Sequence, residues 1–139
     1  MAIEIERKFR VVGDGWRAAA DAGTPYRQGY LAGGAGVTVR VRRAGPRGRL
    51  TIKGPGQGGG LRRAEFEYEI PVADADAMLA SLCQGDLVSK TRYRVPVGAH
   101  TWEVDVFDGL NAGLVIAEVE LGDEAEAFER PAWAGAEVS

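Results

Sequence analysis

The sequence has 139 residues, of which 45% are hydrophobic and 27% charged, and its formal net charge is −3. This length fits one domain with a sizeable core, and the slightly acidic balance argues against nucleic-acid binding. No apolar run is long enough to span a membrane, and charged residues follow Met1 closely. We therefore expect a cytoplasmic protein with no signal peptide and no membrane partner.

Short runs of alternating apolar and polar residues recur along the chain, which is the pattern of β-strands. Eight strands are predicted, at 2–10, 26–31, 37–43, 48–53, 61–71, 87–97, 100–108 and 114–121. Helices are predicted at 74–84 and, from weaker patterns, at 14–22 and 123–129. The first of these has Asp74 as a candidate N-cap and Gly85 beyond its end. No linker or repeat divides the chain, so we predict a single domain over 1–139.

Two scarce residue types limit the chemistry. Cys83 is the single cysteine and His100 the single histidine, so an internal disulfide is impossible and a zinc site would need carboxylates. A Ser-His-Asp or Cys-His mechanism would have to use His100, which lies between a turn and a strand. Chemistry here is therefore expected to use carboxylates, Lys, Arg, Tyr and a hard metal ion.

Charged side chains recur at i, i+2 spacing, which places them on one face of each strand. The sets are Glu4/Glu6/Lys8, Arg40/Arg42, Glu65/Glu67/Glu69, Lys90/Arg92/Arg94, Glu103/Asp105 and Glu118/Glu120, and Lys53 ends another strand. Between residues 37 and 63 there are eight basic residues and no acid, whereas 101–139 holds ten acids and one base. One half of the fold is suited to an anion and the other to a cation, although two solvated faces of opposite sign would give the same pattern.

Periodicity alone does not say which face is inside. A two-sheet sandwich with its charged faces in water gives the same alternation and is the commoner architecture. Two details favour a charged interior instead. The charges are sorted into basic and acidic strands, and amphipathic helices are available to cover apolar outer faces.

The identity of the residues favours the charged interior. The segment Glu4-Ile5-Glu6-Arg7-Lys8 resembles the Glu-x-Glu-x-Lys signature of the CYTH superfamily, the triphosphate tunnel metalloenzymes. Further segments occur in the family's order across nearly the whole chain: Gln28-Gly29-Tyr30-Leu31, Val39-Arg40-Val41-Arg42, Leu50-Thr51-Ile52-Lys53-Gly54, Arg63-Ala64-Glu65-Phe66-Glu67, Lys90-Thr91-Arg92-Tyr93, Trp102-Glu103-Val104-Asp105 and Ala117-Glu118-Val119-Glu120. The chain is most similar to the short bacterial, inorganic triphosphatase-like members.

The resemblance implies a mainly β (α+β) fold: a closed eight-stranded antiparallel β-barrel, with charged residues inside and two or three helices packed outside. It implies a phosphate clamp of Lys8, Arg40, Arg42, Lys53, Lys90 and Arg92. It also implies metal ligands at Glu4, Glu6, Glu65, Glu67, Glu118 and Glu120, with Asp105 as a further candidate, and catalytic roles for Tyr30 and Lys8. Mg²⁺ is the expected cofactor, with Mn²⁺ as the alternative, because hard cations prefer oxygen ligands.

The expected function is metal-dependent hydrolysis of inorganic triphosphate or a related triphosphate. The alternatives are a class IV-type adenylate cyclase and a non-catalytic triphosphate or polyphosphate binder. A monomer and a homodimer are both compatible with the sequence. Related chains continue past a Trp-x-Gly-x-Glu-Val segment into a terminal helix, whereas this sequence ends at Ser139. Either the protein is naturally short and lacks that helix, or the sequence omits a tail.

Overall fold

The computed structural model describes residues 3–34, 36–57 and 61–139. Its strands are β1 (Ile3–Val11), β2 (Thr24–Gly34), β3 (Val37–Ala44), β4 (Arg47–Lys53), β5 (Arg62–Ile70), β6 (Gln84–Val97), β7 (His100–Phe107), β8 (Val115–Glu120) and β9 (Ala134–Glu137). The described ranges also hold one α-helix, α1 (Val72–Ser81), and two 3-10 helices, η1 (Gly15–Ala19) and η3 (Gly109–Asn111). All eight predicted strands are present. Ala2, the first residue of the first predicted strand, lies outside the described residues.

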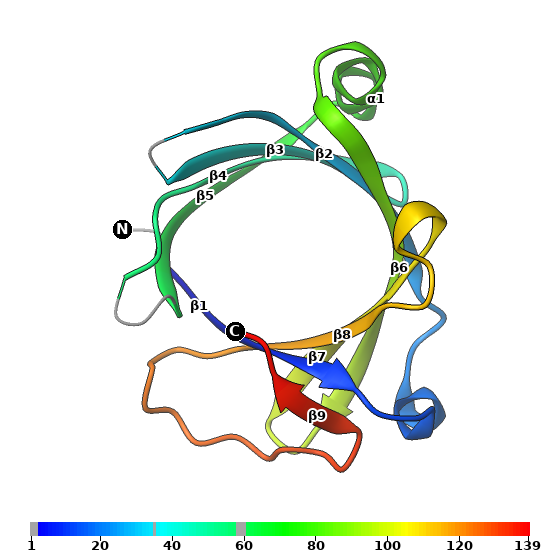
Figure 1. The fold of residues 1–139 in the computed structure, drawn as a ribbon, viewed down its shortest axis with the longest axis vertical. Helices are drawn as coiled ribbons and strands as arrows, with labels where there is room; N and C mark the ends of the chain where they lie inside the picture. The colour runs from blue at the N-terminus through cyan, green and yellow to red at the C-terminus, as the bar shows by residue number, and fades with distance from the viewer. Residues whose placement is uncertain (1–2, 35, 58–60) are drawn as a thin grey trace.

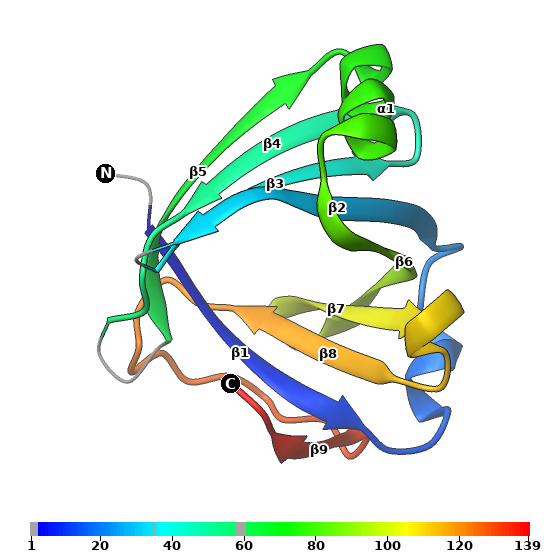
Figure 2. The same cartoon turned by 45° about the horizontal axis from the view of Figure 1, so that its top comes forward.

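Strands β1 to β8 form a closed antiparallel barrel (Figure 1). The order around the ring is β1-β5-β4-β3-β2-β6-β7-β8 and back to β1. The closing pairing joins residues 3–5 of β1 to residues 62–64 of β5, and the two strands diverge beyond it (Figure 2). The barrel fold implied by the family resemblance is therefore confirmed, and the sandwich alternative is wrong.

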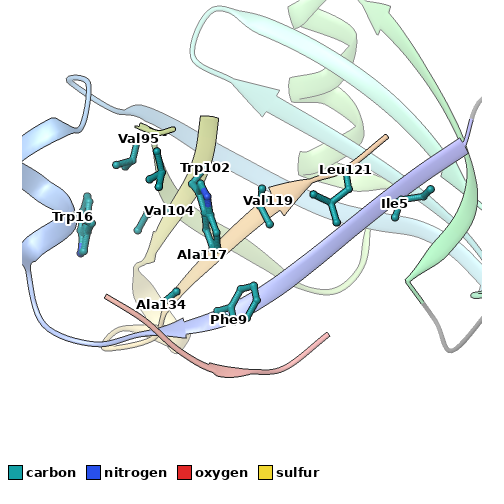
Figure 3. Packing of buried hydrophobic residues seen from close by; sticks show 11 residues of the cluster. Ile5, Phe9, Trp16, Val95, Trp102, Val104, Ala117, Val119, Leu121 and Ala134 are labelled. Atoms are coloured by element: carbon teal, nitrogen blue, oxygen red, sulfur yellow. The ribbon is translucent and has the colours of Figure 1, made fainter. Parts of the chain in front are cut away.

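The larger apolar core lies on the outside of the barrel wall (Figure 3). Phe9 of β1 and Trp102 of β7 are fully buried there, with ring centroids 5.4 Å apart. Trp16 of η1 and Phe128, from the segment after β8, cover this face of the wall. Fully burying such a side chain contributes about 1.5–3 kcal/mol, so the outer layer stabilises the barrel while its interior stays polar.

A second, smaller core lies beneath α1, where Ala75 and Leu79 pack against Val41 of β3. The helix begins two residues before the predicted start. The carbonyl of Pro71 accepts hydrogen bonds from the backbone N–H groups of Asp74 and Ala75. Pro71, not Asp74, is therefore the N-cap, and the Asp74 carboxylate lies in the first turn, where the helix dipole favours a negative charge.

Of the two other helix predictions, the one at 14–22 is partly correct and the one at 123–129 is wrong. The segment predicted as a helix at 14–22 forms the shorter η1. The segment 123–129 is not helical, because its polar groups bond elsewhere: Asp123 accepts from the backbone N–H of Ala125, and Glu126 binds His100 and the N–H of Gly122. This irregular path allows Phe128 to reach the outer core.

Strand β9 was not predicted. It pairs with β1 through Phe9 and Val11 and so extends the sheet outside the barrel. In the part of the chain that the structure describes, no helix has the length and hydrophobicity needed to cross a membrane.

Candidate active site: a charged cavity inside the barrel

The barrel encloses a cavity of about 500 Å³. Its wall includes all the predicted site residues except Asp105: Glu4, Glu6, Lys8, Tyr30, Arg40, Arg42, Lys53, Glu65, Glu67, Lys90, Arg92, Glu118 and Glu120. A smaller cavity of about 160 Å³ shares Lys8, Tyr30, Arg40 and Lys53 with the first. The i, i+2 charged faces of the strands therefore do point inward, as the charged interior requires.

The strand order sorts the cavity wall into two arcs. We call the neighbouring strands β4, β3, β2 and β6 the basic arc, because they carry Lys53, Arg40, Arg42, Lys90 and Arg92. The remaining strands, β7, β8, β1 and β5, form the acidic arc, which carries Glu103, Glu118, Glu120, Glu4, Glu6, Glu65 and Glu67. Lys8 of β1 is a cation within the acidic arc. This division arises from the closure of the barrel, which brings β5 beside β1.

Asp105 of β7 is the centre of a buried ion-pair network at one border between the arcs. It is not among the residues that line the cavity and is 1% exposed. Lys90 Nζ lies 2.6 Å from Asp105 Oδ2, and Arg92 binds both carboxylate oxygens at 2.7 and 2.8 Å. Burial opposes ionisation, but the hydrogen bonds from Arg92 and Lys90 outweigh it and hold the pKa of Asp105 below its ordinary value. Both carboxylate oxygens of Asp105 are thus bonded to cations of the chain, and its metal-binding role stays a prediction.

The positive charges of Lys90 and the nearby Arg42 are only partly neutralised by protein carboxylates. Burial lowers the pKa of Lys90 to about 8, and the attraction of Asp105 offsets only part of that effect. Burial, together with repulsion from Arg40 and Arg92, lowers the pKa of Arg42 to about 10. Arg42 Nε donates to the neutral side chain of Gln28 at 2.7 Å. The basic arc therefore holds charge that an anion would stabilise.

Arg40 is a further cation with unused bonding capacity. Its guanidinium donates to Thr51 Oγ1 at 3.4 Å and lies 4.0 Å from Glu67. Its Nε atom is buried and has no hydrogen-bond partner among the described residues. Because an unpaired buried donor is costly, the Arg40 guanidinium has hydrogen-bonding capacity that the described protein groups leave unsatisfied.

In the acidic arc, buried carboxylates are crowded together and their pKa values are raised. Burial raises the pKa of Glu118, and Glu6 and Asp105 raise it further. Burial and a hydrogen bond with Glu65 raise the pKa of Glu4. Burial and repulsion from surrounding carboxylates likewise raise the pKa of Glu120. Crowded carboxylates of this kind would be relieved by a bound cation.

The donor chemistry of the acidic arc fits a hard divalent cation. Its side chains offer carboxylate oxygens, the ligand that Mg²⁺ prefers. Among the described residues, no group of three acidic, histidine or cysteine side chains is already close enough to hold a metal ion. Mg²⁺ is commonly held by one or two carboxylates plus substrate phosphates and water, so this spacing fits an ion that binds together with a phosphate substrate.

The two residues predicted to be catalytic, Tyr30 and Lys8, both line both cavities. Tyr30 of β2 pairs with Arg40 of β3 and lines both cavities. Lys8 Nζ lies 3.4 Å from Glu6 and 3.9 Å from Glu118. Burial opposes the charged form of Lys8, but these two carboxylates outweigh it and raise its pKa. Lys8 is therefore a stable cation among the carboxylates of the acidic arc.

Several cavity residues had no predicted site role: Tyr26, Gln28, Arg49, Arg94, Glu103, Val88, Phe107 and Ile116. Glu103 contacts Arg92 at 3.3 Å, and its i, i+2 relation to Asp105 already placed it on the inner face. Tyr26 and Gln28 lie at i−4 and i−2 from Tyr30 on the same strand, so extending the alternation from Tyr30 would have found them.

Two proteins named inorganic triphosphatase are similar to this chain along nearly its whole length. The protein from Acetivibrio thermocellus is 47% identical over 139 residues, which cover 100% of this chain and 87% of the relative. The protein from Nitrosomonas europaea is 40% identical over 143 residues, covering 98% of this chain and 89% of the relative.

Solved structures share the fold. The crystal structure of an inorganic triphosphatase matches with a TM-score of 0.63 and 33% identity, covering 99% of this chain and 87% of the other. A Pyrococcus horikoshii protein matches with a TM-score of 0.67 at 17% identity, covering 87% of this chain and 79% of the other. The CYTH domain family matches residues 2–139. Because this family match spans the chain and agrees with the two relatives and the charged barrel interior, the chain belongs to the CYTH family.

Proposed function

We propose that this protein hydrolyses a phosphoanhydride bond of inorganic triphosphate, with Mg²⁺ as its cofactor. The observation that carries this proposal is the facing pair of arcs: a basic wall suited to phosphates lies opposite an acidic wall suited to a cation. The names of the two relatives at 47% and 40% identity support the same substrate.

The basic arc supplies the substrate clamp. Arg40, Arg42 and Arg92 offer forked N–H donors to phosphate oxygens, and Lys53 and Lys90 add point charges. These groups are fixed on neighbouring strands, so they need little rearrangement as negative charge shifts toward the leaving diphosphate. Asp105 orients Lys90 and Arg92 through the hydrogen bonds to its buried carboxylate.

The acidic arc would hold the metal ion, together with substrate phosphates and water, through one or two carboxylates drawn from Glu4, Glu6, Glu65, Glu67, Glu118 and Glu120. A bound divalent ion would neutralise phosphate charge and favour attack by water. In the reaction, a water oxygen forms a bond to a terminal phosphorus, the bridging P–O bond breaks, and one proton is released. We assign Tyr30, acting as its phenolate, to accept that proton and the Lys8 cation to stabilise charge at the reacting phosphate.

The test is phosphate release from tripolyphosphate, ATP and thiamine triphosphate, each with Mg²⁺, with Mn²⁺ and with EDTA. Fastest release from tripolyphosphate with Mg²⁺, abolished by EDTA, is the expected result. Tight binding without phosphate release under either metal would identify a non-catalytic binder. Cyclic AMP formed from ATP would identify a cyclase, and both outcomes would overturn the proposal.

A further inference from the structure

The ring of Tyr26 lies among three cations of the basic arc. The guanidinium carbon atoms of Arg42 and Arg92 are 4.7 and 5.0 Å from the ring centroid, and Lys90 Nζ is 5.8 Å from it. A cation within about 6 Å of an aromatic face is attracted by the ring's quadrupole. Tyr26 therefore meets this criterion with all three, and it lines the same cavity.

The strand register explains this position. Tyr26 of β2 is directly opposite Lys90 of β6. Arg92 lies opposite Thr24 and Arg42 opposite Gln28, each two residues along β2 from Tyr26. Residues directly opposite and diagonal on the same face of a sheet are the ones whose side chains meet. The contact is thus built into the pairing of β3, β2 and β6.

To bind phosphate, the three cations must be held in place by a partner that does not neutralise their charge. Asp105 binds Lys90 and Arg92, whereas Arg42 bonds to neutral Gln28 and is repelled by Arg40 and Arg92. A second carboxylate at position 26 would hold the cations but would also compete with phosphate for them. An aromatic ring attracts cations without carrying a net charge, so it steadies them and leaves their positive field available.

We propose that Tyr26 is a positioning residue for the triphosphate substrate. Its ring holds Arg42, Lys90 and Arg92 together so that their remaining N–H donors face the substrate phosphates. This inference rests on the proposed function, because it assumes that the basic arc binds the phosphates. The phenol hydroxyl has no part in it, and the aromatic face is the feature that matters.

The test compares Tyr26→Phe, which keeps the aromatic face, with Tyr26→Leu, which removes it. We expect Tyr26→Leu to raise the KM for tripolyphosphate roughly tenfold, with kcat changed by less than about threefold. Tyr26→Phe should stay within about twofold of the wild type in both constants. Tyr68→Leu, at a tyrosine that is 57% exposed on β5, is the matched control and should leave both constants unchanged.

A series of fluorinated phenylalanines at position 26 keeps the inference testable if Tyr26→Leu does not fold. Fluorine withdraws charge from the ring face while nearly preserving its shape, so KM should rise stepwise with the number of fluorines. A flat series, or an unchanged KM in folded Tyr26→Leu, would overturn the positioning role while leaving the hydrolase intact. A wild-type protein that neither hydrolyses tripolyphosphate nor is stabilised by it would instead defeat the proposed function, and this inference with it.

Discussion

Lys53 Nζ lies 3.0 Å from both carboxylate oxygens of Glu4, although these residues belong to strands β4 and β1, which are not neighbours. Strand β5 lies between them, and its Glu65 is 3.4 Å from the same ammonium group. A predicted phosphate-binding cation is therefore bonded to a predicted metal ligand. A triphosphate would compete with Glu4 for Lys53, and this exchange would free Glu4 to bind a cation.

The first prediction is that tripolyphosphate and Mg²⁺ bind cooperatively. Together they should raise the melting temperature by more than the sum of their separate shifts, because each ligand releases the residue that the other needs. Differential scanning fluorimetry at millimolar ligand measures this directly. Strictly additive shifts would contradict the exchange, and no shift with both ligands would mean that the cavity does not bind them.

The second prediction concerns the phosphate clamp. Arg42→Ala should raise the KM for tripolyphosphate roughly 10- to 100-fold, since a hydrogen bond to a charged group contributes about 1.5–3 kcal/mol. Arg27 lies on the same strand but is exposed and alternates to the outer face, so Arg27→Ala is the matched control. Steady-state kinetics of the two purified variants gives the comparison. Equal KM values would remove Arg42 from the clamp.

The third prediction concerns the acidic arc. Glu6→Gln should lower turnover, and excess Mg²⁺ should partly restore it, because a lost ligand weakens metal binding. Glu69 of β5 is exposed and lies 3.8 Å from Arg47, so Glu69→Gln should leave the Mg²⁺ dependence unchanged. An Mg²⁺ titration of both variants at saturating tripolyphosphate is the measurement. A Glu6→Gln variant with an unchanged Mg²⁺ curve would exclude Glu6 from metal binding.

Much of the fold was predictable because its signals are local. Alternation located all eight barrel strands and placed Arg42 and Glu118 on the charged faces of their strands, which the structure turns toward the cavity. The choice of barrel over sandwich came from the family resemblance, since periodicity is the same for both. Strand β9 was missed because Ala134–Glu137 is short and pairs with β1 only through the tertiary fold.

The candidate site was predictable residue by residue but not contact by contact. The pairing of Lys53 with Glu4, and of Arg92 with Glu118 at 3.4 Å, depends on how the ring closes across intervening strands. Tyr26 was not predicted as a site residue for another reason. It is uncharged, so a search for charged i, i+2 sets passes over it although it faces the same cavity.

The fourth prediction concerns the anchoring of β9 and its dependence on pH. Arg7 of β1 binds Glu137 of β9 through two hydrogen bonds, of 2.9 and 2.5 Å. The hydrogen bond from Arg7 is the main reason that the pKa of Glu137 falls to about 2 from its ordinary value of 4.5. A carboxyl whose pKa is depressed in the folded state stabilises that state above its unfolded pKa and loses this contribution as the pH falls.

Glu137→Gln should therefore lower the free energy of unfolding near neutral pH by about 0.2–1 kcal/mol, the range for a solvent-exposed ion pair. The difference from the wild type should shrink as the pH falls from about 5 toward about 2, because Glu137 is protonated first in the unfolded state and then, progressively, in the folded state. Urea unfolding of the two proteins across this range is the measurement. Glu124→Gln, at an exposed carboxylate in the segment before β9, is the control for loss of one negative charge. If the stability difference for Glu137→Gln keeps its size throughout this pH range, the ion pair with Arg7 is not its origin.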